Sequence, residues 1–202
     1  MKKILCVLSS PSGEYSVSNK LAKAIVEKLS SSSDSEVTEF DLTKEDIPHI
    51  DGATIAAFYT PAEYLDDDKK ATLATSDRVI DALLAADEIV ISVPFHNFGI
   101  PSSLKAWIDH VARVGKTFYF NADGTPTGMV TGKKVFLAIS SGGIYSSGPM
   151  QSFDFAEPYL RAILGFLGIT DVTTFRAEGM AIPGVKEIAL PNAIEQLSQI
   201  SA

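Results

Sequence analysis

Residues 94–101 combine aromatic, amide and imidazole side chains in one short loop that two prolines stiffen. The loop follows an apolar run, residues 88–93, that predicts a buried strand, and it precedes residues 102–110, which are typical of a helix. A loop at the carboxyl end of a central strand is where open α/β sheets bind ligands. Its rings suit a flat heteroaromatic ligand whose edge meets backbone N–H and C=O groups. A loop that only turns the chain into a helix is the alternative.

A second candidate site is the turn after the first predicted strand. Residues 9–19 bring hydroxyls and exposed backbone N–H groups to the N-terminus of a predicted helix over residues 18–29. A helix N-terminus attracts anions, and hydroxyls donate to phosphate oxygens. Because Lys20 is the first cation after this turn, the pattern predicts a monophosphate held by neutral donors. Helix capping by Ser16 or Ser18 is the alternative, and the two roles are compatible.

The third candidate loop covers residues 140–145, after another apolar run at residues 135–139, and begins with Ser140, Ser141, Gly142 and Gly143. Two glycines after a strand let the backbone approach a ligand closely, although an ordinary glycine turn has the same pattern. The turn after the first strand thus offers hydroxyls and a helix N-terminus. The loop at residues 94–101 offers aromatic and amide groups, and the third loop offers exposed backbone. Flavin mononucleotide (FMN) fits this division, because it has one phosphate, a ribityl chain and a flat isoalloxazine ring.

Several other phosphate-binding and catalytic motifs are absent from the sequence. The dinucleotide-binding motif Gly-x-Gly-x-x-Gly is absent, because the turn after the first strand contains only one glycine, Gly13. Neither a P-loop nor a Gly-x-Ser-x-Gly elbow occurs. A cysteine-phosphatase loop would need an Arg where Ser12 stands. The three histidines lack the spacing of metal ligands, so we expect no metal and place His49, His96 and His110 in loops or at the surface.

Composition indicates a globular protein that does not bind nucleic acid. With 202 residues, 46% of them hydrophobic, the chain can bury a large core, and we expect a single domain over residues 1–202. The net charge of −8 disfavours contact with phosphate backbones. No apolar run reaches the roughly 20 residues of a membrane span, and the N-terminal run has no cleavage-like site. The only cysteine, Cys6, excludes an internal disulfide, so we expect a cytoplasmic protein.

Strand-like and helix-like segments alternate along the chain, which predicts an α/β fold. Strands are expected over residues 3–9, 36–42, 87–93, 134–139 and 172–176, with the second strand at an edge. Helices are expected over residues 18–29, 69–86, 101–114, 153–167 and 187–200, whereas residues 47–68 are irregular or hold a short helix. Five strands separated by helices predict a flavodoxin-like three-layer sandwich around a five-stranded parallel sheet of order 2-1-3-4-5.

The chain resembles the FMN-dependent NADH azoreductases, which are also quinone reductases. The similar blocks are residues 9–10 with 15–19, 94–98 with 104–105, 130–134, 140–143, and 159–160 with 165–171. The resemblance implies three groups of flavin contacts: Ser10, Ser16, Val17 and Ser18 at the phosphate, Phe95, His96, Asn97 and Phe98 around the isoalloxazine ring, and Ser140, Ser141, Gly142 and Gly143 at its edge or other side. His96 stands where Tyr is common, and Ser141 where one branch has Arg.

The resemblance also implies an activity. It implies an FMN-dependent NAD(P)H oxidoreductase that reduces quinones and aromatic azo compounds by two-electron ping-pong hydride transfer. We expect NADH rather than NADPH as the donor, because no obvious Arg would favour the extra phosphate of NADPH, and we expect no catalytic side chain. The resemblance further implies a homodimer. The expected substrate-pocket residues, for each of which core packing is an alternative, are Phe58, Tyr59, Phe118, Phe120 and Phe166. Two other hypotheses are a flavodoxin-like electron carrier or FMN-binding module without nicotinamide turnover, and a flavin-free regulatory protein.

Overall fold

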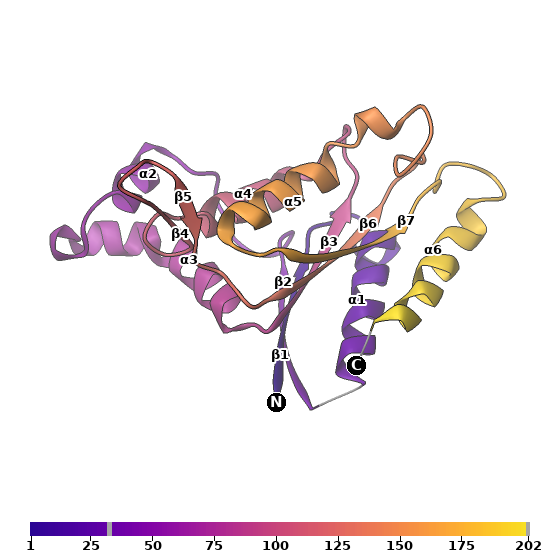
Figure 1. The fold of residues 1–202 in the computed structure, drawn as a ribbon, viewed down its shortest axis with the longest axis horizontal. Coiled ribbons are helices and arrows are strands. Elements are labelled where there is room, and N and C mark those ends of the chain that lie inside the picture. The colour runs from indigo at the N-terminus through magenta and orange to yellow at the C-terminus, as the bar shows by residue number, and fades with distance from the viewer. Residues whose placement is uncertain (32–33, 201–202) are drawn as a thin grey trace.

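The computed structural model describes residues 1–31 and 34–200. In this part of the chain, strands and helices alternate as the sequence predicts (Figure 1). The strands are β1 (Lys2–Leu8), β2 (Ser35–Asp41), β3 (Glu88–Pro94), β4 (Phe118–Phe120), β5 (Pro126–Gly128), β6 (Lys134–Ser140) and β7 (Asp171–Ala177). The α-helices are α1 (Val17–Ser30), α2 (Gly52–Phe58), α3 (Asp67–Ala85), α4 (Ser102–Val111), α5 (Ala156–Leu167) and α6 (Lys186–Glu195). Short 3-10 helices are η1 (Gly13–Tyr15), η2 (Ala62–Tyr64), η3 (Gln151–Phe153) and η4 (Gln196–Gln199).

Five of the strands form one parallel sheet with the order β2-β1-β3-β6-β7. Counted within the sheet, this is the predicted order 2-1-3-4-5, so the predicted flavodoxin-like topology is confirmed. The edge position of β2 is confirmed as well, and Phe40 is its only buried residue. All seven residues of β3 are buried, as expected for a strand with neighbours on both sides.

Successive side chains of a strand point to opposite faces, which divides the sheet's apolar residues into two buried clusters. Leu5 and Val7 of β1 belong to a cluster that includes residues of α3, α4 and α5, such as Leu83, Trp107 and Leu160. The alternate residues of β1 belong to a second cluster with α1 and α6, whose members include Ile4, Cys6, Leu21, Ile25 and Ala193. Among residues 1–31 and 34–200, no helix has the length and apolarity to cross a bilayer.

Cys6 lies in the second cluster and is 1% exposed. Burial removes water from the thiol and, with the nearby Glu39 carboxylate, raises the pKa of Cys6 to about 12. The thiol therefore stays protonated at neutral pH.

The antiparallel hairpin of β4 and β5 is the one element pair that the sequence analysis did not anticipate. Each strand has only three residues, too few for an alternating pattern to be recognised. Gly128 of this hairpin lies against the end of α5, where the Val130 N–H donates to the Leu167 carbonyl at 2.8 Å. A Cβ at Gly128 would lie 2.2 Å from the Gly168 nitrogen and the Leu167 carbonyl carbon.

The last two helices differ from the predicted limits for local reasons. The helix predicted from residue 153 begins at Ala156, because the Asp154 carboxylate accepts hydrogen bonds from the N–H groups of Ala156 and Glu157. The helix predicted over residues 187–200 ends at Glu195 and continues as η4. Pro191 lies inside α6 and supplies no N–H to the helix.

Replacing Gly128 tests the contact between the hairpin and α5. Gly128→Ala is expected to lower the free energy of unfolding by about 2 kcal/mol or more, because the methyl group meets backbone atoms that cannot move alone. Gly165→Ala, in α5 with open space at its Cβ position, is the matched control and should raise stability by up to about 1 kcal/mol. Urea unfolding measures both, and equal midpoints for the two variants would contradict the packing described.

Candidate functional site

The three predicted ligand loops lie side by side, because the parallel strands β1, β3 and β6 end at the same edge of the sheet. The Ser103 hydroxyl, at the start of α4, donates to the Ser9 carbonyl at 3.4 Å. The Phe95 N–H donates to the Ser140 carbonyl at 2.8 Å. These bonds join the first loop to the helix that follows β3, and the loop after β3 to the loop after β6.

The turn after β1 presents hydroxyls at the start of α1. The side chains of Ser10, Ser16 and Ser18 are buried. Ser16 is the N-cap, and its Oγ accepts a hydrogen bond from the Asn19 N–H at 3.1 Å while lying 3.2 Å from the Ser18 Oγ. The N–H groups of Val17 and Ser18 begin the helix and have no partner within it. Hydroxyls and helical N–H groups therefore lie together at this turn, a combination of donors that can bind an anion.

A chain of buried hydrogen bonds fixes this turn to the sheet. The Ser92 hydroxyl of β3 donates to Asn19 Oδ1 at 2.6 Å and accepts from the Ser9 N–H at 3.1 Å. The Ser9 hydroxyl in turn donates to the Ser92 carbonyl at 2.6 Å. Sequence analysis missed the roles of Ser92 and Asn19. The available signal was a hydroxyl inside the otherwise apolar run of β3, since a buried polar group needs a partner.

The loop after β3 ends in a tight turn over His96, Asn97, Phe98 and Gly99. His96 and Gly99 exchange two backbone hydrogen bonds of 2.9 Å each. The two central residues have positive φ, 47° at Asn97 and 69° at Phe98, as a type I′ turn requires. For a bulky residue such as Phe98 this backbone costs roughly 1–2 kcal/mol. The strain places the Asn97 and Phe98 side chains at an exposed tip, with Phe98 41% exposed.

The Gly-rich loop after β6 is bound to the segment that follows β7. The Ser141 N–H donates to the Ala177 carbonyl at 3.2 Å, and the Gly142 carbonyl accepts from the Ala181 N–H at 2.9 Å. The Ser141 hydroxyl donates to the Gly143 carbonyl at 2.8 Å, so it stabilises the loop itself.

Two aromatic residues that the sequence analysis did not select contact the loop after β3. The Tyr145 ring stacks on Phe95 with centroids 4.3 Å apart, and the Phe153 ring lies 5.4 Å from Phe98. The Phe155 N–H donates to the Phe98 carbonyl at 3.0 Å. Residues 144–155 therefore form an aromatic border beside the predicted ring site.

The predicted substrate-pocket residues fall into two groups. Phe118 lies between Phe120 and Phe166, with ring centroids 5.6 and 4.6 Å away, and it is buried. Phe58 instead contacts the Arg113 guanidinium, 5.4 Å from its ring, whereas Tyr59 is 69% exposed. Ring contacts therefore join Phe118 to Phe120 and Phe166, whereas the ring contacts of Phe58 are with His110 and Arg113.

The predicted surface or loop position of His110 is wrong. His110 lies in α4 and is 1% exposed, because the segment before α2 covers it. Its Nε2 is 2.9 Å from the Pro48 carbonyl oxygen, whereas its Nδ1 has no hydrogen-bond partner among residues 1–31 and 34–200. His49 and His96 lie in loops, as predicted.

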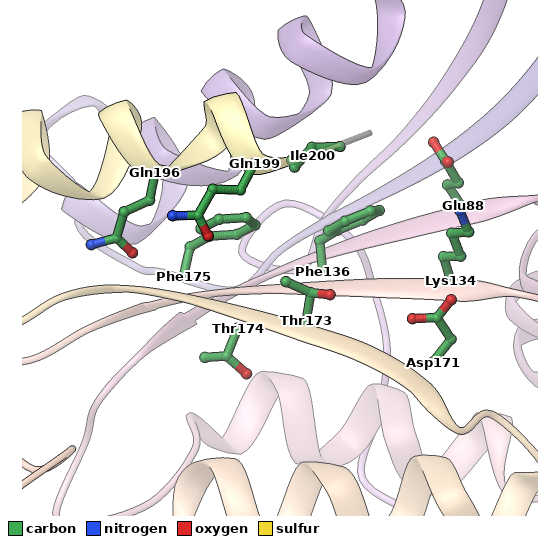
Figure 2. A pocket seen from close by; sticks show the side chains of 10 residues that line it. All are labelled: Glu88, Lys134, Phe136, Asp171, Thr173, Thr174, Phe175, Gln196, Gln199 and Ile200. Carbon is green, nitrogen blue, oxygen red and sulfur yellow. The ribbon is translucent and has the colours of Figure 1, made fainter. Parts of the chain in front are cut away.

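A cavity of about 290 Å³ lies at the opposite end of the sheet from the three loops (Figure 2). Glu88, Lys134 and Asp171 border it in one row across β3, β6 and β7, and Gln196 and Gln199 of η4 line its other side, next to Phe175. No residue predicted to bind the ligand lines this cavity. The candidate site is therefore not this cavity but the place where the loops after β1, β3 and β6 meet, which we call the loop edge.

The fold and the loop edge define the class of protein. The chain matches the flavodoxin-like fold family over residues 2–200 and belongs to that family. It is 46% identical over 183 residues to an FMN-dependent NADH:quinone oxidoreductase of Herminiimonas arsenicoxydans, covering 90% of this chain and 89% of the relative. It is 44% identical over 203 residues to FMN-dependent NADH:quinone oxidoreductase 1 of Rhizobium etli, covering 100% and 98%.

Solved structures agree with these relatives. An azoreductase from Bacillus anthracis strain Sterne superimposes with a TM-score of 0.90 at 30% identity, covering 98% of each chain. An FMN-dependent NADH-azoreductase from Bacillus anthracis strain Ames Ancestor, in complex with FMN, gives a TM-score of 0.86 at 27% identity, covering 100% of each chain. The predicted resemblance to the FMN-dependent azoreductases and quinone reductases is confirmed.

An ion network at the end of β7 lies beside the aromatic border. Glu157 Oε1 accepts from the Thr174 hydroxyl and Arg161 Nε, both at 2.7 Å, and Oε2 lies 2.5 Å from Arg176 Nη2. Burial alone would raise the pKa of Glu157, but these hydrogen bonds outweigh it and hold the pKa below its usual range.

The lowered pKa predicts how the stability depends on pH. A carboxyl whose pKa is lower in the folded chain stabilises the fold above its unfolded pKa, about 4.3 for Glu, and loses this effect as the pH falls through the folded value. Glu157→Gln should therefore be less stable than the natural chain at pH 7, and the difference should shrink in acid. Urea titrations from neutral to acid pH measure this.

Glu187→Gln is the control, because its side chain is 57% exposed and exposed ion pairs contribute little. Parallel pH–stability curves for Glu157→Gln and the natural chain would contradict the assignment.

Proposed function

We propose that this protein is an FMN-dependent NADH oxidoreductase that reduces quinones and aromatic azo compounds. The observation that carries the proposal is the meeting of a neutral anion-binding turn, an aromatic turn and a Gly-rich loop at one edge of the sheet. The names of the relatives and of the FMN-bound structure support it.

The donors at the loop edge fit FMN. Ser10, Ser16 and Ser18, with the first N–H groups of α1 at Val17 and Ser18, would hold the phosphate, because they supply several donors without a cation. Phe95, His96, Asn97 and Phe98 would surround the isoalloxazine ring. Ser140, Ser141, Gly142 and Gly143 would approach it through their backbone, since the Ser141 hydroxyl already bonds to Gly143.

When bound, FMN supplies the redox chemistry, accepting a hydride from NADH or less readily NADPH and passing two electrons to the acceptor in a ping-pong cycle. The side chains of this protein bind and orient the reactants and exclude water. Asn97 and nearby backbone N–H groups would donate toward the ring edge, and we assign no side chain a role as nucleophile or base.

We further propose that the two buried clusters are the two sides of a three-layer sandwich, and that Phe58, Tyr59, Phe118, Phe120 and Phe166 contribute to the substrate pocket. Tyr59 and Phe120 are 69% and 55% exposed in a single chain. Such exposure fits a pocket that a second copy completes, so we propose a homodimer. A cytoplasmic location fits a single buried cysteine.

The homodimer is tested by sedimentation equilibrium of the natural chain, whose mass is 21.6 kDa. Twice that mass across the micromolar range is the expected result, because burial of the exposed aromatic side chains favours association. A single-chain mass at these concentrations would contradict the homodimer.

Flavin reduction by NADH tests the proposed activity. The protein loaded with FMN should lose its flavin absorbance when mixed with NADH and regain it when a benzoquinone is added. Failure of NADH to bleach the flavin would favour an electron carrier instead, and failure to bind FMN would reject both functions.

Ser16→Ala tests the proposed phosphate turn. The variant should bind FMN about tenfold more weakly, because a hydrogen bond to a charged group contributes about 1.5 kcal/mol or more. Ser31→Ala is the matched control, since its hydroxyl donates to the Lys28 carbonyl at the other end of α1. FMN fluorescence titrations measure both, and equal affinities would remove Ser16 from the site.

A further inference from the structure

Three aromatic side chains lie at the proposed ring site, one in the turn after β3 and two in the segment between β6 and α5. We name Phe98, Tyr145 and Phe153 the aromatic wall. The Tyr145 and Phe153 rings both contact Phe98, with centroids 6.3 and 5.4 Å from it. Phe98 is 41% and Phe153 43% exposed, so the wall presents apolar faces to solvent beside the site. Flat aromatic molecules pack favourably against such rings.

Glu178 holds the Tyr145 end of the aromatic wall. Its Oε1 accepts hydrogen bonds from the N–H groups of Tyr145 and Ser146, at 2.9 and 3.0 Å. Its Oε2 accepts from the Ser146 hydroxyl. The Glu178 side chain is only 10% exposed, so these charge-assisted bonds are shielded from water. One carboxylate thus fixes the backbone that carries the Tyr145 ring.

Asp154 holds the Phe153 end of the wall. Its Oδ1 accepts from the N–H groups of Ala156 and Glu157, at 3.0 and 3.2 Å, and so determines where α5 begins. Phe153 directly precedes this cap. The Phe155 N–H, just after it, donates to the Phe98 carbonyl at 3.0 Å. The segment around Asp154 is therefore bound both to α5 and to the turn that carries Phe98.

Arg176, near the end of β7, joins the two carboxylates. Its Nη1 lies 3.2 Å from Glu178 Oε1, and its Nη2 lies 2.5 Å from Asp154 Oδ2. The Arg176 side chain is 15% exposed, and its charge is the cation that both of these carboxylates share. A planar guanidinium can bind two carboxylates at once in fixed directions, which the single ammonium of Lys cannot reproduce.

We propose that Arg176 is a positioning residue that fixes where Tyr145 and Phe153 lie around Phe98. It thereby sets the affinity of the protein for flat aromatic acceptors. The proposal rests on the proposed oxidoreductase function and extends it to residues that touch neither flavin nor acceptor. In the natural chain, Arg176 holds the carboxylates of Glu178 and Asp154 in place. These carboxylates in turn bind the backbone that carries Tyr145 and the backbone that follows Phe153. Tyr145 and Phe153 are the wall residues proposed to contact the acceptor, whereas FMN is held by the phosphate turn and by the loop after β3, to which Phe98 belongs.

Arg176→Lys and Glu178→Gln, each loaded with FMN, test the proposal. Steady-state rates are measured with NADH and two acceptors: a naphthoquinone, which can stack on the wall, and ferricyanide, which cannot. The KM for the naphthoquinone should rise about fivefold in both variants, the change expected when one aromatic contact is lost. The steady-state rate of ferricyanide reduction and the dissociation constant of FMN should stay within about twofold of the natural values, because neither depends on stacking against the wall.

Two further variants make the result decisive. Arg78→Lys is the matched control, because Arg78 forms an ion pair of 2.8 Å with Glu45 away from the wall and should leave every parameter unchanged. Phe153→Leu removes an exposed ring without disturbing the ion network and should reproduce the rise in KM.

The outcomes separate the two proposals. An unchanged KM for the naphthoquinone in Arg176→Lys and Phe153→Leu would overturn the positioning role. A parallel loss of FMN affinity or of the ferricyanide rate would also overturn it, because Arg176 would then support the fold or the flavin site. If the natural protein itself fails to take up FMN or to oxidise NADH, the oxidoreductase function fails first.

Discussion

The common direction and register of the five sheet strands is the constraint on which the candidate site depends. Because β1, β3 and β6 are parallel neighbours, three loops far apart in sequence must emerge at one edge. Successive apolar residues of a strand belong to the two different buried clusters. A one-residue shift in register would exchange their faces, so the register of the strands is strongly constrained. The loops can therefore be strained, as at Phe98, while the strands beneath them hold their ends in place.

Much of this arrangement can be predicted from sequence because its signals are local. Continuous apolar runs identify the inner strands, and the mixed pattern of residues 36–42 identifies the edge strand β2. Serines before α1 and glycines after β6 indicate loops that can approach a ligand. Each of these signals spans only a few consecutive residues, so the sequence alone indicates the strands and the three loops. The sheet order then follows from the general rules for connections between parallel strands.

Contacts between distant residues are what the sequence alone does not reveal. Ser92 and Asn19 are 73 positions apart, and Glu178 lies 32 positions after Ser146, yet each pair shares a hydrogen bond. Tyr145 and Phe153 join the site through contacts with Phe95 and Phe98, residues far from them in sequence. The buried position of His110 also arises from a distant segment, the chain around Pro48. Polarity indicates that such residues need partners, but not which partners they have.

The depth of Cys6 in the core acquires a chemical meaning if quinones are the acceptors. Quinones are soft electrophiles that form covalent adducts with thiolates, and only a deprotonated, accessible sulfur reacts quickly. With 1% exposure and a pKa of about 12, the Cys6 sulfur meets neither condition. A protein that handles such molecules at every turnover would thus carry its sole sulfhydryl where its own substrates cannot alkylate it.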